Sequence, residues 1–393
     1  MNITFLLRLW PVYGGGETVT ICLANEMIKR GWNVSVLYFK NNTRTDLPFI
    51  DPAVKAVQIP DIRCDEFTTR FPDADKVTSY LKEYIQENDI HYLVNQWWPV
   101  EYIRGIRGRY KTKIVTCLHQ ALYTPMIEGT GINGFLKKRC TSLYKFWKKR
   151  HSCRQVTKFL PHTDKYIFLS PAFQRQYEQF ANYKNTNSQL GAIPNPLVFP
   201  NEIRPEDLQS KEKTVLLVGR MVEIQKRITR AIKIWSAIEN DPRLDEWNFR
   251  IVGEGPDLAM YKQLAQTLGL KRISFEGFRN PQPYYKQAAI FMMTSAFEGF
   301  PMTLVEAQQC GVVPVVMDSY LSLHDIVETG YNGIIVSNED LTGYVNKIKE
   351  LMTDTSLREK LAMNGLHSCR RFCVEEIVNN WEELFNDLSA NRR

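Results

Sequence analysis

The stretch Ile290-Phe-Met-Met-Thr-Ser-Ala-Phe-Glu-Gly-Phe-Pro-Met-Thr-Leu-Val-Glu-Ala307 joins a short apolar run, a Gly-Phe-Pro turn and a helical segment. The apolar run predicts a buried strand that ends near Ser295. The turn predicts a helix that begins at about Met302. A buried strand followed directly by a helix is the repeating unit of a doubly wound parallel sheet, so this stretch indicates an α/β fold.

The start of this helix is a candidate anion site. The first backbone N–H groups of a helix, here around Met302–Leu304, have no partner inside the helix, and the helix dipole favours a negative charge such as a diphosphate. Glu306, one turn inside, could accept hydrogen bonds from a ribose diol, and Glu298 could meet sugar hydroxyls. The alternative is a pair of solvated glutamates on a surface helix. Apolar neighbours argue against it: Phe300, Pro301, Leu304 and Val305.

The same alternation of strands and helices extends in both directions along the chain. Three prolines in 191–200 and the polar run 201–213 interrupt it, which predicts a domain boundary there. The pattern restarts at Thr214, and an amphipathic stretch, Val374–Leu388, follows the last strand candidates. We therefore expect two Rossmann-like domains, residues 1–198 and 199–373, and a C-terminal helix in 374–393.

Composition restricts the class of protein further. The 393 residues carry a net charge of +7 and 44% hydrophobic residues, which fits a globular protein and permits an anionic partner. No apolar run approaches the roughly 20 residues that span a bilayer, and the first residues lack a secretory signal, so we expect a cytoplasmic location. The 8 cysteines form no Cys-x-x-Cys pair. Asp73-Ala-Asp75 precedes a helix and suits N-capping, so we predict no metal.

A second candidate element lies upstream. Leu216-Leu-Val-Gly-Arg220 ends a predicted strand in Gly219 and Arg220, and Lys226 follows six residues later. An arginine suits bidentate phosphate contacts and a lysine supplies a point charge. Together the two cations could clamp the diphosphate that the helix start would hold.

These residues together resemble the retaining GT-B glycosyltransferases of family 4, which use nucleoside-diphosphate sugars. The resemblance covers nearly the whole chain. Its motifs occur in the family's order: Gly14-Gly-Gly-Glu-Thr, Val218-Gly-Arg-Met with Lys226, Ile251-Val-Gly-Glu-Gly-Pro256, Ser274-Phe-Glu-Gly-Phe278, the Glu298-x7-Glu306 pair and Tyr331-Asn-Gly-Ile-Ile-Val336. The implied fold is two Rossmann-like doubly wound domains that face each other across a cleft, with the C-terminal helix crossing back to the first domain.

The resemblance also implies roles for matching positions. Arg220, Lys226, Glu298 and His119 would be the catalytic group, although His119 could equally be a packed core histidine. The donor would be bound by a larger set: Gly15, Gly16, Gly219, Gly253, Gly277, Phe278, Gly299, Phe300, Thr303, Leu304 and Glu306. Five residues separate Arg220 from Lys226 where many members have four, and Arg227 replaces the common glycine.

The implied reaction is retaining transfer of a hexosyl unit to a glycan or lipid-linked glycan, in surface polysaccharide biosynthesis. A UDP-sugar is the expected donor by family default, with no cofactor and no metal. Two alternatives remain open: another GT-B sugar-nucleotide enzyme, such as an epimerase or a phosphorylase, and a non-catalytic partner subunit that binds nucleotide sugar. No phosphorylase-type cofactor lysine motif is evident.

Two further sets of residues point to the acceptor and to a membrane. Trp97 or Trp98, after a predicted strand, could stack on an acceptor sugar, or could be buried in the core. Residues 135–159 form a basic amphipathic segment that suits the anionic inner face of the plasma membrane, or else packs on the domain as a solvated helix. Its candidate surface residues are Lys145, Trp147, Lys148, Lys149 and Arg150. No nucleic-acid-binding module accompanies the charge.

Overall fold

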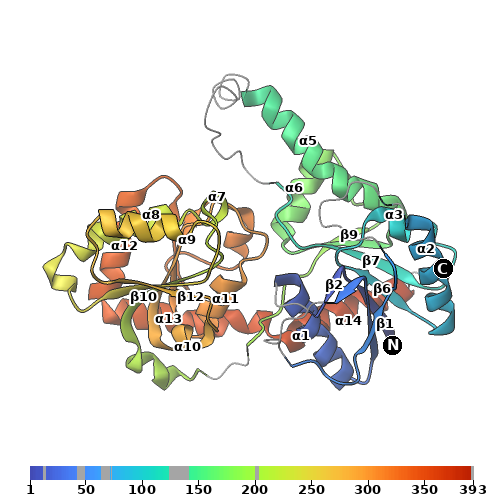
Figure 1. Ribbon diagram of the computed structural model, residues 1–393, viewed down its shortest axis with the longest axis horizontal. Coiled ribbons are helices and arrows are strands. Elements are labelled where there is room, and N and C mark those ends of the chain that lie inside the picture. Colours follow the sequence, from blue (N-terminus) through green and yellow to red (C-terminus); the bar gives the residue numbers. More distant parts are fainter. Residues whose placement is uncertain are drawn as a thin grey trace. The chain divides into compact units, whose positions relative to one another are not determined.

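The computed structural model describes residues 1–11, 15–41, 49–62, 71, 73–123, 141–199 and 203–390, without the side chains of residues 141–145. Gly14 and residues 135–140, which the sequence analysis used, lie outside this part. The chain divides into two compact units. The first holds the described residues up to Val198 together with those from Cys373 onward, and the second holds Phe199–Phe372 (Figure 1).

The first unit is built on a seven-stranded parallel sheet with the order β5-β3-β1-β6-β7-β8-β9. Its strands are β1 (Asn2–Leu6), β3 (Asn33–Tyr38), β5 (Lys55–Gln58), β6 (Tyr92–Asn95), β7 (Lys113–Leu118), β8 (Lys165–Phe168) and β9 (Leu190–Ala192). A short pair, β2 (Leu9–Trp10) and β4 (Lys40–Asn41), continues beyond the sheet. The chain therefore leaves the main sheet after Leu6, and Leu9 pairs with Lys40 in this separate ribbon.

Helices cover this sheet and follow its strands: α1 (Gly15–Lys29), α2 (Ala74–Glu87), α3 (Val100–Ile103), α5 (Thr141–Phe159), α6 (Pro171–Ala181) and α14 (Val374–Ala390), with the 3-10 turn η1 (Leu160–His162). At α6, the Ser170 side chain accepts a hydrogen bond from the Ala172 amide and Pro171 occupies the first helical position. Asp73 occupies the N-cap position of α2, as the sequence predicted. Its side chain makes no capping hydrogen bond, so that part of the prediction for Asp73-Ala-Asp75 was wrong.

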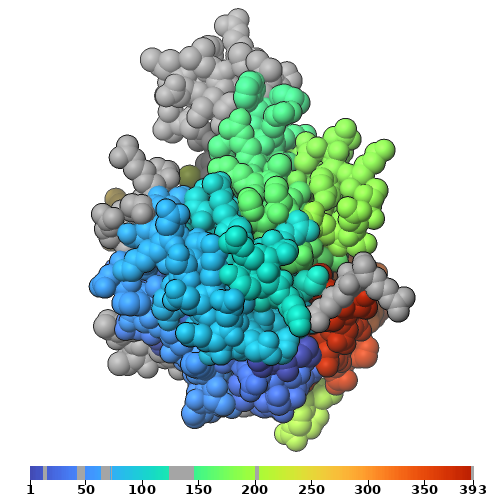
Figure 2. Space-filling model, turned by 90° about the vertical axis from the view of Figure 1, so that its right-hand side faces the viewer, coloured from blue at the N-terminus to red at the C-terminus, as the bar shows by residue number. Residues whose placement is uncertain are grey.

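Helix α14 belongs to the first unit although it follows the second unit in sequence. Its apolar face contributes Ile377, Trp381 and Phe385 to the same core as β1 and α1. The Tyr92 hydroxyl donates to the Phe385 carbonyl at 2.7 Å. In Figure 2 the red helix lies next to the blue N-terminal part of the chain, in agreement with the contacts between α1 and α14.

The second unit repeats the architecture with a six-stranded parallel sheet of order β12-β11-β10-β13-β14-β15. Its strands are β10 (Glu212–Val218), β11 (Asn248–Val252), β12 (Ile273–Gly277), β13 (Ala288–Met293), β14 (Val313–Asp318) and β15 (Ile334–Ser337). Every residue of β13 is buried, as expected for a central parallel strand with helices on both faces. This strand is the apolar run from which the fold was predicted.

The helices of the second unit are α7 (Glu223–Lys226), α8 (Ile228–Glu239), α9 (Leu258–Thr267), α10 (Gln282–Gln287), α11 (Met302–Gln309), α12 (Leu341–Thr353) and α13 (Thr355–Ser368). Short 3-10 turns connect them: η2 (Pro205–Ser210), η3 (Pro242–Leu244), η4 (Leu321–Asp325) and η5 (Cys369–Phe372). Helix α8 packs against α9 and α12, whereas α11 packs against α13 and η5. The carboxyl ends of the parallel strands share one edge, where ligands bind in such sheets.

Among the helices that the structure describes, none combines the length and the apolar character needed to cross a bilayer. The six described cysteines are free thiols.

Candidate functional site

Three predicted glycines lie at neighbouring strand ends of the second unit. Gly219, Gly253 and Gly277 follow or end β10, β11 and β12, and the Gly253 amide donates to the Gly277 carbonyl at 2.8 Å. Gly253 has a φ of +140°, and a Cβ there would collide with the Gly219 carbonyl oxygen. The backbones can approach this closely only because these positions lack side chains. Half-buried main chain without side chains therefore lines this edge of the sheet.

Lys226 and Glu298 form an ion pair beside these glycines. The Lys226 Nζ lies 2.7 Å from Glu298 Oε1, and the two side chains are only 15% and 8% exposed. Gln225 donates to the other oxygen, Oε2, at 3.2 Å. A Cβ on Gly219 would lie 3.3 Å from Lys226 Cε, so the lysine stem crosses directly over this glycine. Two predicted site residues 72 positions apart are thus brought into direct contact.

The backbone at Arg227 decides which of the neighbours Lys226 and Arg227 lies beside the strand ends. It has a φ of +48°, in the left-handed region that favours glycine. Its guanidinium donates to Asn338 Oδ1 at 3.1 Å, whereas Lys226 reaches Glu298. Lys226 is therefore the residue beside the strand ends, and Arg227 occupies the position with left-handed backbone conformation.

Arg220 is exposed and follows directly after Gly219. The neighbouring Met221 is buried, and its amide donates to the Glu254 carbonyl at 2.7 Å, which fixes the backbone of this turn. Within the part of the chain that the structure describes, no side-chain partner is found for the Arg220 guanidinium. The structure places Arg220 at the strand edge but does not join it to the Lys226–Glu298 pair.

The start of α11 is less open than the sequence predicted. The Leu304 amide donates to the Pro301 carbonyl at 2.9 Å, so its N–H is not free and that prediction was wrong. The tight turn at Pro301 directs the Pro301 carbonyl toward the amide of Leu304, three residues later. Among the described residues, no acceptor is found for the amides of Met302 and Thr303. The candidate anion site is accordingly limited to these two N–H groups.

Glu306 is buried and held by a residue that the sequence analysis missed. Its side chain is nearly inaccessible, and burial raises its pKa to about 7 despite a hydrogen bond from Tyr285 that lowers it. The Tyr285 hydroxyl lies 3.0 Å from Glu306 Oε2 and 3.2 Å from the Thr303 carbonyl. No motif or spacing marked Tyr285, because α10 and α11 are brought together only by the fold.

The remaining predicted donor residues differ in their exposure. Phe278, next to Gly277, is 51% exposed. Phe300 is buried and packs edge-on against Phe372, with ring centroids 5.3 Å apart. Gly299 is half-buried between Glu298 and Phe300. Phe300 therefore anchors the turn before α11, whereas Phe278 presents an aromatic face to solvent.

In the first unit, Trp97 and His119 form a second cluster. Trp97 follows β6 and His119 follows β7, and the centroids of their rings lie 5.2 Å apart. Both ring nitrogens of His119, the Trp97 Nε1 and the Gln96 Oε1 are buried without a hydrogen-bond partner among the described residues. Burial also lowers the pKa of His119 to about 4. Buried polar atoms without partners are costly, so this cluster differs from an ordinary packed core.

Gly16 belongs to this cluster. A Cβ at this position would lie 3.0 Å from the Trp97 ring, so the glycine allows α1 to approach the indole closely. Gly15 is the first residue of α1. Gln96, only 4% exposed, is a polar residue of the cluster that the sequence analysis did not identify, and its position at the end of a predicted strand was the available signal.

Trp98 is a core residue, and its prediction as an acceptor-binding residue was wrong. It is 1% exposed, its indole N–H donates to the Leu7 carbonyl at 2.7 Å, and its ring stacks on Phe39 at 4.7 Å. A ring enclosed in this way offers no face to a sugar.

The basic helix α5 is buried on one side and exposed on the other. Cys153 and Val156 of α5 pack into a core cluster of the first unit, together with Leu160 of the following turn η1. Trp147 is 58% exposed, and so is Phe146 at 56%. Two of the predicted lysines lie over aromatic rings: Lys148 Nζ is 5.5 Å from the Tyr123 centroid and Lys149 Nζ is 4.6 Å from that of Phe180. Arg150 is exposed, and the side chain of Lys145 is outside the described part.

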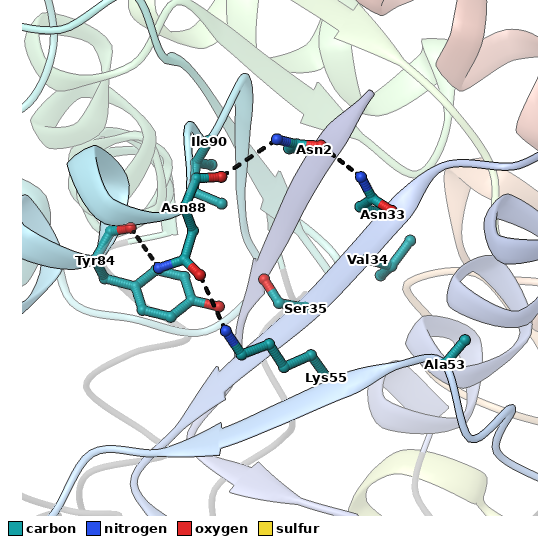
Figure 3. A pocket seen from close by; sticks show the side chains of 9 residues that line it. All are labelled: Asn2, Asn33, Val34, Ser35, Ala53, Lys55, Tyr84, Asn88 and Ile90. Atoms are coloured by element: carbon teal, nitrogen blue, oxygen red, sulfur yellow. Dashed lines mark hydrogen bonds between the residues drawn. The ribbon is translucent and has the colours of Figure 1, made fainter.

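A pocket of about 330 Å³ lies at the opposite edge of the first sheet (Figure 3). Its polar side chains bind one another: Asn33 donates to Asn2 Oδ1 at 2.9 Å, and Lys55 donates to Asn88 Oδ1 at 3.0 Å. The pocket lies at the amino ends of β1 and β3 and contains none of the predicted site residues. In the described part of the chain, His, Cys, Asp and Glu side chains form no group that could hold a metal ion.

Two parallel α/β units, with glycine-lined strand ends and a glutamate-bearing helix in the second, define the class of GT-B glycosyltransferases. The family model described as "Glycosyltransferase Family 4" matches residues 13–197, and the model described as "Glycosyl transferases group 1" matches residues 198–367. The chain therefore belongs to the family 4 glycosyltransferases, and it is a glycosyltransferase. Both the predicted family and the predicted fold class are confirmed.

The chain is also similar to individual proteins. The chain is 23% identical over 99% of both lengths to a Campylobacter jejuni enzyme named GalNAc-alpha-(1->4)-GalNAc-alpha-(1->3)-diNAcBac-PP-undecaprenol alpha-1,4-N-acetyl-D-galactosaminyltransferase. It is 28% identical over 52% of its length to the Streptomyces coelicolor exopolysaccharide phosphotransferase SCO2592, of which the match spans only 21%. Among solved structures, Anabaena Alr3699/HepE in complex with UDP superposes with a TM-score of 0.70 at 18% identity, over 98% of this chain and 100% of that one.

Proposed function

We propose that this glycosyltransferase transfers a hexosyl unit from a nucleoside-diphosphate sugar, with UDP as the favoured nucleotide, to a glycan or lipid-linked glycan during surface polysaccharide assembly. The observation that carries the proposal is the buried Lys226–Glu298 pair beside the glycine-lined strand ends. The name of the Campylobacter relative contains an undecaprenol-linked glycan, and UDP is bound in the HepE structure. Both support this choice of acceptor and donor.

The residues of the second unit would bind the donor. Lys226 has three N–H donors, so it can keep Glu298 and still contact a phosphate oxygen. Arg220, exposed and without a described partner, is available for the same diphosphate, and the amides of Met302 and Thr303 supply further donors. Glu298 would hold the transferred sugar and Glu306 the ribose hydroxyls. Because the protein fixes these cations and amides in place before the reaction, they can stabilise the negative charge that develops on the departing diphosphate.

The reaction breaks the bond between sugar C1 and the diphosphate oxygen and forms a bond from C1 to the acceptor hydroxyl oxygen. The hydroxyl proton passes to the departing phosphate, so no separate oxidant or cofactor is needed. Attack on the same face as the departing phosphate retains the configuration at C1. His119 would remain neutral under these conditions, since burial lowers its pKa, and could contact the reacting sugar, while Trp97 would contact the acceptor.

A thermal-shift screen against UDP- and GDP-sugars tests the donor, because a ligand that binds only the native state stabilises it by mass action. We expect a UDP-sugar to raise the unfolding temperature. Arg220→Ala should abolish transfer with the fold intact, whereas Arg243→Ala, an exposed arginine paired with Asp241, should have no effect. If Arg220→Ala transfers sugar at the parent rate, then Arg220 does not stabilise the departing diphosphate and the proposed mechanism is refuted. A changed sugar nucleotide without a glycoside product would indicate an epimerase, and binding without turnover would indicate a partner subunit.

We also propose that α5 binds the anionic inner face of the plasma membrane peripherally. Phe146 and Trp147 are exposed next to Lys148, Lys149 and Arg150, and an interfacial aromatic beside cations suits a lipid surface. The parent should sediment with vesicles that contain anionic lipid, and the Lys148→Glu, Lys149→Glu variant should not. Reversal of two exposed lysines of the second unit, Lys262 on α9 and Lys360 on α13, would control for net charge. A parent that fails to bind such vesicles contradicts the proposal.

A further inference from the structure

Among the described residues, a hydrogen-bond donor reaches only one oxygen of the Glu306 carboxylate. Tyr285, fully buried on α10, contacts Oε2 at 3.0 Å. Among the described residues no hydrogen-bond donor reaches the other oxygen, Oε1. Glu306 keeps 6% of its surface accessible, so one face of the carboxyl group is enclosed and a small part stays open. A carboxylate held in this way presents a single oriented oxygen to a ligand.

The Tyr285 hydroxyl carries one proton and lies within hydrogen-bonding distance of two described acceptors. Glu306 Oε2 lies at 3.0 Å and the Thr303 carbonyl at 3.2 Å. When Glu306 is ionised, the phenol donates to the carboxylate. When Glu306 is protonated on Oε2, the acid donates to the phenol oxygen and the phenol donates to Thr303. Every proton therefore has an acceptor in either state, so the same three groups accommodate both forms of Glu306.

Lys211 fixes the two helices that carry this arrangement. Its buried Nζ donates to the carbonyls of Tyr285 at 2.9 Å, Lys286 at 2.8 Å and Cys310 at 2.6 Å. The first two carbonyls belong to α10, and the third stands at the C-terminal end of α11. One ammonium group thus ties α10 to α11, which holds the Tyr285 hydroxyl at bonding distance from Glu306.

Burial and the Tyr285 hydrogen bond determine the pKa of Glu306, whereas the charged groups around it do not shift this pKa. Besides α10, the elements packed against α11 are β13, β14, α13 and η5. Strand β13 carries no titratable side chain, and the groups on the others are Asp318, Arg358, Glu359, Lys360, His367, Cys369, Arg370 and Arg371. None of these shifts Glu306: burial raises its pKa to about 7, and the Tyr285 hydrogen bond is the opposing influence.

We propose that Tyr285 is a positioning residue that keeps Glu306 ionised and oriented for the donor ribose, so that nucleotide-sugar binding weakens as the carboxylate takes up a proton. The proposal rests on the proposed function, in which Glu306 binds the ribose hydroxyls. An ionised carboxylate accepts two charge-assisted hydrogen bonds from a diol, whereas the protonated acid has lost both the charge and part of its accepting capacity. Donor binding then depends on pH near neutrality through one side chain.

The test is calorimetric titration of the full chain with UDP-glucose and with UDP-N-acetylglucosamine from about pH 5.5 to about pH 8.5, a range in which their diphosphate does not titrate. In the parent, affinity should fall roughly tenfold per pH unit below the midpoint. Tyr285→Phe should move this midpoint to higher pH and bind on the order of tenfold more weakly at about pH 7, with the gap narrowing as the pH rises. Tyr284→Phe is the matched control, because it removes a hydroxyl from the same helix, α10, that bonds to Glu276 on β12. This variant should follow the parent curve.

Glu306→Gln supplies the second measurement. It should bind weakly with an affinity that no longer depends on pH in this range. Tight parent binding that is flat with pH would overturn the role of Tyr285 and leave the proposed function standing, and so would an unmoved midpoint in Tyr285→Phe. Absence of UDP-sugar binding by the folded parent at every pH would overturn both proposals.

Discussion

Replacing Glu306 by Gln should make the protein more stable at neutral pH. The carboxyl group titrates at about 4.5 in an unfolded chain and at about 7 when buried beside Tyr285. Below the lower value both states are protonated. Between the two values the unfolded chain has lost the proton while the native state keeps it, so stability falls as pH rises, and the loss is complete above the native pKa. Glutamine has the same shape and no such titration.

The magnitude follows from the shift in pKa. A shift of about 2.5 units at about 1.4 kcal/mol per unit corresponds to about 3 kcal/mol of stability. Relative to the parent, Glu306→Gln should therefore gain about 3 kcal/mol between about pH 5 and about pH 8. For a unit of 150–250 residues this corresponds to roughly 6–12 °C in the unfolding temperature.

The assay is thermal unfolding of parent and variant across this pH range, with the difference taken at each pH so that shared titrations cancel. Glu328→Gln, which removes an exposed carboxylate of the same unit, is the control and should show a constant small difference. If the Glu306→Gln and parent curves run parallel from about pH 5 to about pH 8, then Glu306 does not carry this burial cost and the reasoning is refuted.

Three further changes test other parts of the second unit. Lys226→Ala should cost about 3 kcal/mol because Glu298 keeps a buried, unpaired charge, and adding Glu298→Gln should restore part of the loss in a double-mutant cycle of chemical unfolding. Gly253→Ala should cost more than about 2 kcal/mol, since its Cβ meets backbone, whereas Gly269→Ala, at a φ of +69° with open space around it, should cost only about 1 kcal/mol. Arg227→Gly should stay within about 1 kcal/mol of the parent, while Arg227→Val should lose about 1–2 kcal/mol in the same denaturation assay.

The architecture followed from local sequence signals. The apolar run that became β13 and the turn that became the start of α11 were sufficient to predict a parallel α/β unit, because burial and turn chemistry act over a few residues. The two-residue ribbon in which Leu9 pairs with Lys40 was not predicted, because it depends on a neighbouring segment that local periodicity does not specify.

The candidate site was only partly predictable for the same reason. Glu306 was identified from its place on the helix, but its partner Tyr285 comes from another element and carries no motif. The pairing of Lys226 with Glu298 is likewise a tertiary contact across 72 positions. Trp97 and Trp98 are adjacent in sequence, yet only packing decides which of them is enclosed.

Helix α14 has a consequence for how the molecule is made. A ribosome completes the whole second unit before it synthesises the helix that supplies Trp381 and Phe385 to the core of the first. Until then the nascent first unit exposes the apolar surface that this helix covers, including the ring of Tyr92, which stacks on Phe385 at 4.2 Å. Newly made first units are thus open to chaperones and to one another for the entire time that the second unit takes to emerge.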